Sequence, residues 1–173
     1  MFFGKDRKKI DRFVGEFKGE SDRGCAVLVL CVLEDLLIET VKQRLPTCSA
    51  DELRAIAPFG RLSTTVSNAF LIGAISKRER DEFLRLIKIR NKFAHKALEG
   101  LSFSHPDIVD MCRKLELADV FNEFSSENPR IRFTISALLI YCTLHNTLGV
   151  IDTLKELESR KHVLESYSDY DQQ

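Results

Sequence analysis

Apolar residues recur at every third or fourth position along most of the chain, and this spacing predicts α-helices. In residues 6–18, for example, Ile10, Phe13, Val14 and Phe17 fall on one face of a helix. No stretch of convincing length alternates apolar and polar residues with a period of two, as a half-buried strand would. Capping residues, glycines and prolines divide the rest of the pattern into further segments. These expected helices span about residues 21–45, 49–57, 62–73 and 76–97, a short piece that begins near residue 104, and residues 133–160.

Two of the expected helices, near residues 25–45 and 133–158, are apolar nearly all round in their first halves. A helix without a polar face belongs in the interior of a protein. Residues 118–132 are rich in polar residues and are interpreted as a loop. We therefore predict an all-α fold, a single-domain helical bundle of residues 1–160 with the two apolar helices at its centre. A polar C-terminal tail is expected at residues 161–173.

The charge balance argues against direct DNA reading. Lys plus Arg and Asp plus Glu both number 26, so the formal net charge is zero, whereas nucleic-acid binders usually carry a basic excess. One local exception is the helix at 76–97, which opens with a Ser76–Glu79 capping box and carries eight positive and three negative side chains. It is either a solvated face or a binding surface for an acidic protein or for phosphates. The candidate binding residues on it are Arg78, Arg85, Lys88 and Lys92.

Residues 56–68 imitate the turn and recognition helix of a DNA-binding headpiece. The spacing from Gly60 to the next serine is one residue too long, and Pro58 would break the first helix. We interpret Ser63 as a helix cap instead.

Little in the sequence suggests a membrane, a metal or a cofactor. The longest unbroken apolar run has nine residues, whereas a membrane span needs about 20, so a cytoplasmic protein is expected. The five cysteines form no C-x-x-C pair, and we expect them to be reduced core residues. His145 has no second potential ligand at i+4 and is interpreted as a hydrogen-bonded core histidine. No phosphate-binding loop or serine nucleophile motif is present.

Several short motifs, spread over about half of the chain, resemble those of the mannitol operon repressor family. They are Glu20–Gly24, Leu33–Leu37, Ala57–Phe59, Leu71–Ser76, Ile87–His95 and Ser102–Phe103. The resemblance implies an all-α bacterial regulator that lowers expression of a mannitol uptake operon. Because that family lacks a recognised DNA-binding module, it implies repression through a protein partner from the transcription or sugar-uptake machinery, and it leaves a homodimer open. The motif residues that matter are Asp22, Arg23, Glu34, Asp35, Arg90, Asn91 and His95.

A second resemblance uses the same stretch. Arg90 and His95 bracket four residues, and Asn91 follows the arginine directly, which is similar to the R-x4-H signature of the HEPN superfamily. Many HEPN domains are metal-independent endoribonucleases that act as dimers. The resemblance would make Arg90, Asn91 and His95 catalytic, with histidine as general base or acid and arginine stabilising the phosphate charge.

Helix geometry weighs against catalysis within one chain. On a regular helix, Arg90 and His95 project about 140° apart. Arg90 is therefore expected to point inward and to pair with a carboxylate, for which Asp22, Glu34 and Asp35 are the candidates. A partner-binding surface, or a ribonuclease site completed across a dimer, remains the alternative. A regulatory binding protein is our first prediction, and the endoribonuclease is the second.

Overall fold

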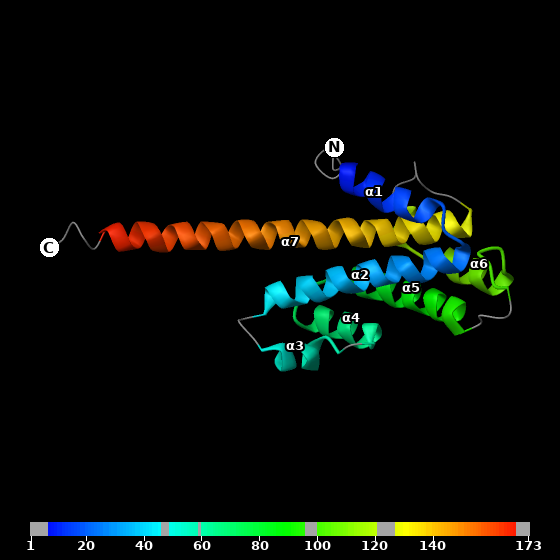
Figure 1. Cartoon of the computed structure of the whole chain (residues 1–173), viewed down its shortest axis with the longest axis horizontal. Coiled ribbons are helices and arrows are strands. Elements are labelled where there is room, and N and C mark those ends of the chain that lie inside the picture. Colours follow the sequence, from blue (N-terminus) through cyan, green and yellow to red (C-terminus); the bar gives the residue numbers. More distant parts are fainter. Residues whose placement is uncertain (1–6, 46–48, 59, 96–99, 121–126, 169–173) are drawn as a thin grey trace.

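The computed structural model describes residues 7–45, 49–58, 60–95, 100–120 and 127–168, and in the last helix it describes side chains as far as Ile151. These residues form seven α-helices and one short 3-10 helix and contain no strand, which confirms the all-α prediction (Figure 1). The helices are α1 (Arg7–Lys18), α2 (Asp22–Arg44), α3 (Ala50–Ile56), α4 (Leu62–Leu71), α5 (Lys77–His95), α6 (Pro106–Arg113), the 3-10 helix η1 (Leu117–Asp119) and α7 (Pro129–Ser168).

The two apolar helices of the sequence, α2 and α7, run side by side through the middle of the bundle (Figure 1). Helix α5 packs against both of them and against α4, which in turn packs on α3. Helix α6 and η1 lie on α7, and α1 lies over α2 and α7 together. The prediction of two central helices is therefore confirmed. The C-terminal half of α7 runs on beyond the end of α2 in Figure 1.

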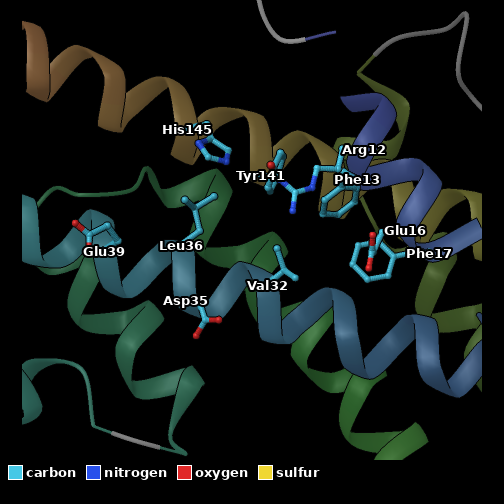
Figure 2. A pocket seen from close by; sticks show the side chains of 10 residues that line it. All are labelled: Arg12, Phe13, Glu16, Phe17, Val32, Asp35, Leu36, Glu39, Tyr141 and His145. Atoms are coloured by element: carbon cyan, nitrogen blue, oxygen red, sulfur yellow. The ribbon is translucent and has the colours of Figure 1, made fainter. Parts of the chain in front are cut away.

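Helix α2 is not buried on every side, although its first half is apolar nearly all round. Its side chains from Cys25 to Leu37 form much of the core, but Leu28 is 43% exposed and Val32 is 37% exposed. Cys31 is exposed and Cys142 is half-buried, so the expectation that the cysteines lie in the core is wrong for these two. It is confirmed for Cys25 and Cys112, and Cys48 lies outside the described residues. Val32 points into the open space between α2 and α7 (Figure 2).

Several predicted helix boundaries need correction. The expected loop at 118–132 already contains the end of η1, and α7 begins at Pro129, four residues before the predicted start at 133. Its early start has a local cause, because the Asn128 side chain accepts hydrogen bonds from the backbone N–H groups of Arg130 (3.0 Å) and Ile131 (3.2 Å). At the other end α7 continues to Ser168, so the predicted tail at 161–173 begins inside a helix.

The predicted caps have mixed outcomes. The Ser76–Glu79 capping box is confirmed: the Ser76 N–H donates to the Glu79 carboxylate (2.6 Å), and the Glu79 N–H donates to the Ser76 hydroxyl (3.3 Å). Ser63 is not a cap, because α4 starts one residue earlier and Arg61 occupies the N-cap position without a side-chain hydrogen bond.

Part of α7 also has the length and composition of a membrane span. The segment Pro129–Ile151 is the one such segment among the described helices. In the bundle α7 packs against α1, α2, α5, α6 and η1, and 28% of the apolar window is buried by these contacts.

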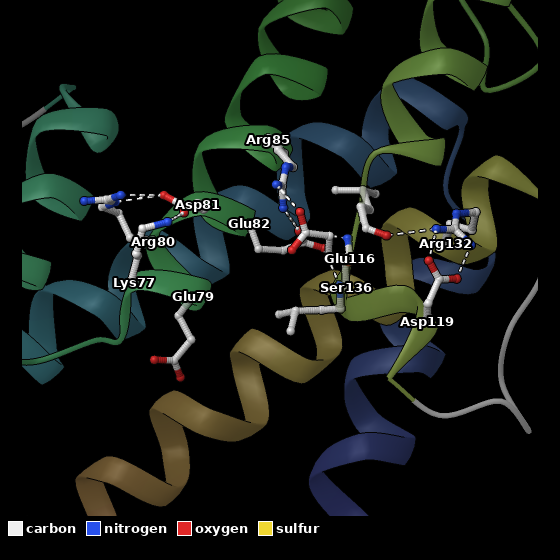
Figure 3. Close-up of polar contacts among 12 residues, drawn as sticks. Lys77, Glu79, Arg80, Asp81, Glu82, Arg85, Glu116, Asp119, Arg132 and Ser136 are labelled. Atoms are coloured by element: carbon white, nitrogen blue, oxygen red, sulfur yellow. Dashed lines mark hydrogen bonds and ion pairs between the residues drawn. The ribbon is translucent and has the colours of Figure 1, made fainter.

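Glu82 joins three elements from a fully buried position. Its carboxylate, 0% exposed, accepts hydrogen bonds from the backbone N–H groups of Glu116 (3.1 Å) and Leu117 (3.0 Å) and from the Ser136 hydroxyl (Figure 3). The Arg85 guanidinium completes the set at 2.9 Å. Glu82 thus ties α5 to η1 and α7. A buried charge is tolerated only with such complete pairing.

We predict that Glu82→Ala is strongly destabilising. The change leaves two backbone N–H groups and the Ser136 hydroxyl without their acceptor inside the protein, and should lower the free energy of unfolding by about 3–5 kcal/mol. Glu116→Ala is the matched control, because that exposed carboxylate shares the same arginine and should cost less than about 1 kcal/mol. Chemical denaturation of both variants measures the difference. Equal stability of the two would show that the buried network contributes nothing.

Candidate functional site

The Glu20–Gly24 motif lies where helices α1, α2 and α7 meet. The Asp22 carboxylate accepts hydrogen bonds from the Arg130 guanidinium (2.7 Å) and from the Phe103 backbone N–H (2.9 Å). The same guanidinium donates to the carbonyl oxygens of Phe17 (3.1 Å) and Glu20 (2.6 Å) at the end of α1. Asp22 therefore pairs with Arg130, and the expectation that Asp22 could be the partner of Arg90 is wrong.

Arg23 connects the same motif to α5. Its Nε donates to the carbonyl oxygen of Phe93 at 3.0 Å. The Phe93 ring lies 4.9 Å from the Phe103 ring, which lies 5.4 Å from Phe133 in α7. Three of the motifs that carry the family resemblance, at 20–24, 87–95 and 102–103, thus come together in one joint. Asp22 and Arg23 bind other parts of the chain, so their role in this joint is structural.

Arg90 is half-buried in α5 and acts on Glu34 of α2. Burial raises the pKa of the Glu34 carboxyl above its usual value, the Arg90 guanidinium opposes this rise, and the neighbouring Asp35 adds to it. Arg90 forms no direct ion pair with any residue whose side chain the structure describes. Of the three candidate carboxylates, Glu34 is thus the one that interacts with Arg90, through charge rather than through a hydrogen bond.

The other two members of the possible catalytic set lie in different surroundings. His95 is exposed at the last residue of α5, and Asn91 is half-buried one turn earlier. Neither of the two pockets described for this structure, between α1, α2 and α7 and between α1 and α7, is lined by Arg90, Asn91 or His95.

The predicted basic surface on α5 is partly neutralised by the fold. Arg85 binds Glu82 and also Glu116. Lys92 lies 3.2 Å from the Asp107 carboxylate at the start of α6. Two of the four predicted binding residues are therefore already engaged with carboxylates of this chain.

The remaining charges on α5 divide into paired and unpaired groups. Lys77 and Arg80 both lie 2.7 Å from Asp81 (Figure 3). Arg78 and Lys88 are exposed and form no ion pair within the described part of the chain. The local excess of positive charge available to a partner is thus smaller than the sequence count indicates.

An open groove lies between α1, α2 and α7 (Figure 2). Its volume is about 510 Å³. It is lined by Arg12, Phe13, Glu16 and Phe17 of α1, by Val32, Asp35, Leu36 and Glu39 of α2, and by Tyr141 and His145 of α7.

A row of aromatic rings forms one side of this groove. The ring centroids of Phe17 and Phe13 are 5.0 Å apart, those of Phe13 and Tyr141 are 4.8 Å apart, and those of Tyr141 and His145 are 4.5 Å apart. Rings at these separations attract one another beyond their hydrophobic burial. His145 is half-buried at the groove, so the interpretation of this histidine as a core residue needs correction.

The rim of the groove is acidic. Three carboxylates, of Glu16, Asp35 and Glu39, face one guanidinium, of Arg12. The Glu39 carboxylate lies 3.9 Å from Lys42, a distance that gives only weak pairing at an exposed site. Asp35, which the sequence marked as a motif residue, is therefore a groove residue, whereas no other groove residue was predicted as a site residue.

The described residues contain no group of three or more His, Cys, Asp or Glu side chains that could hold a metal ion. The cysteines among them are free thiols. Burial raises the pKa of the Cys112 thiol to about 12, with Arg132 opposing the rise. A thiol with such a pKa stays protonated at neutral pH and is a poor nucleophile.

Comparison with known proteins gives no match, whether against models of protein families, curated proteins or solved structures.

We predict that Arg130 contributes more to stability than Arg90. Arg130→Ala removes three hydrogen bonds made by a charged group and should lower the free energy of unfolding by about 2–3 kcal/mol. Arg90→Ala, the control on α5, removes only a charge–charge interaction with Glu34 and should cost about 1 kcal/mol. Thermal and urea unfolding of both variants provide the measurement. A larger loss for Arg90→Ala would mean that Arg90 is the central ion-pairing residue after all.

Proposed function

We propose that this protein is a non-enzymatic bacterial regulator of the mannitol operon repressor type, which acts in the cytoplasm by binding a protein partner. The observation that carries the proposal is the open groove between α1, α2 and α7, which combines an aromatic side with an acidic rim. An acidic rim repels phosphates and suits a protein ligand. The proposed class of regulator comes from the sequence motifs that resemble the mannitol operon repressor family.

The charge distribution supports a protein partner over DNA. The net charge is zero, and Arg85 and Lys92 of the basic helix are engaged in ion pairs. DNA affinity depends largely on free Lys and Arg side chains that replace counterions along the phosphates.

The half-buried position of Arg90 weighs against the ribonuclease alternative. A catalytic arginine must reach the attacked phosphate, whereas the charge of Arg90 acts on Glu34. A dimer could still bring an exposed His95 to a second chain. The ribonuclease alternative therefore predicts that RNA cleavage requires His95.

The proposal predicts that deleting the gene raises expression of a reporter placed under the mannitol uptake promoter in the native host. The wild-type gene and His95→Ala should restore repression equally, because the proposed regulator uses no catalytic histidine. The purified protein should form no competitor-resistant complex with the promoter at physiological salt. An unchanged reporter would refute the regulatory role. RNA cleavage in EDTA that is lost in both Arg90→Ala and His95→Ala would favour the ribonuclease.

A further inference from the structure

We propose that the groove between α1, α2 and α7 binds an amphipathic helix with a basic polar face, supplied by the partner protein. This inference rests on the proposed function and adds the docking surface and the chemistry of the ligand. It is carried by the shape of the groove walls, by their exposed apolar surface and by the sign of the rim charges.

The walls of the groove have the spacing of helix ridges. The four residues from α2 lie at i, i+3, i+4 and i+7 between Val32 and Glu39, and the two from α7 lie four residues apart, at Tyr141 and His145. Residues with these spacings form ridges along a helix, into whose grooves another helix can pack. A further helix is thus the ligand shape that the walls accommodate.

Helix α1 is too short to cover the whole groove between α2 and α7. Helix α1 has 12 residues and α2 has 23, which correspond to about 18 Å and about 34 Å. In Figure 1, α1 covers only the part of the α2–α7 pair near their N-terminal ends. Beyond it, no described element lies over the two helices on that side, and Val32 is 37% exposed there.

The charges around the groove select a basic ligand. Glu16 and Asp35 are exposed, and neither forms an ion pair with another residue whose side chain is described. Lysine or arginine side chains of a docked helix would meet these carboxylates. They would also meet the half-buried ring of Tyr141 in the groove wall, where a cation gains a further attraction. A helix with an acidic polar face would be repelled.

Two designed peptides test the inference by fluorescence anisotropy with the full chain. Each is a fluorescein-labelled helix of about 18 residues, long enough to span about 27 Å. Both carry leucine at the i, i+3, i+4 and i+7 positions, with lysine on the polar face of one and glutamate on that of the other. We expect the lysine peptide to bind at least about tenfold more tightly than the glutamate peptide, a difference of about 1.4 kcal/mol.

A pair of charge reversals locates the binding. Asp35→Lys should weaken binding of the lysine peptide by about tenfold. Asp110→Lys, an exposed carboxylate on α6 that lies outside the groove lining, makes the same change in net charge and should leave binding unchanged. Circular dichroism confirms that both variants fold. Equal binding of the two peptides, or equal effects of the two reversals, would overturn the inference.

The reporter assay separates this inference from the proposed function. If Asp35→Lys weakens peptide binding by about tenfold and also impairs repression, both stand. If Asp35→Lys weakens peptide binding to this extent but represses normally, the groove is not the regulatory surface and this inference fails, while the regulatory role remains. If deletion of the gene leaves the reporter unchanged, the proposed function fails whatever the peptides do.

Discussion

The interaction on which the rest of the structure depends is the contact of Arg130 with Asp22. The Arg130 guanidinium joins the first turn of α7 to the first turn of α2 and to the carbonyl groups at the end of α1. Three helices are thereby fastened at one end of the bundle. Because α1 is much shorter than its two neighbours, the space between the three stays open farther along. The groove is thus a consequence of where the helices are joined and of how long each one is.

Most of the fold could be predicted from the sequence. The helical spacing of apolar residues predicts the helices, and the two helices that are apolar nearly all round, α2 and α7, predict the centre of the bundle. The polar interactions could not be predicted. Glu82 occurs in a charged helix, where its pattern is that of a surface residue, yet the groups that donate hydrogen bonds to it lie in η1 and α7. Nor does spacing show that Asp22 pairs with Arg130 rather than with Arg90, since that choice depends on tertiary packing.

The candidate site was predicted less well. Sequence motifs drew attention to Arg90 and His95, whereas the groove consists of residues whose types are those of a core or of an ordinary helix surface. Asp35 was the single groove residue that was predicted as a site residue. One signal was present: α2 has more apolar surface than its neighbours can cover, and Leu28 and Val32 are exposed as a result. An apolar helix that is exposed on one side suggests an interaction surface.

Hydrogen–deuterium exchange of the full chain, with and without the lysine-bearing peptide, tests the central claim most directly, because it reports where backbone amides become protected. The account predicts slower exchange in residues 12–17, 32–39 and 141–145 when the peptide is bound, with no change in residues 88–95. Protection confined to residues 88–95, with unchanged exchange along the groove, would contradict it and would return the binding site to the Arg90–His95 region.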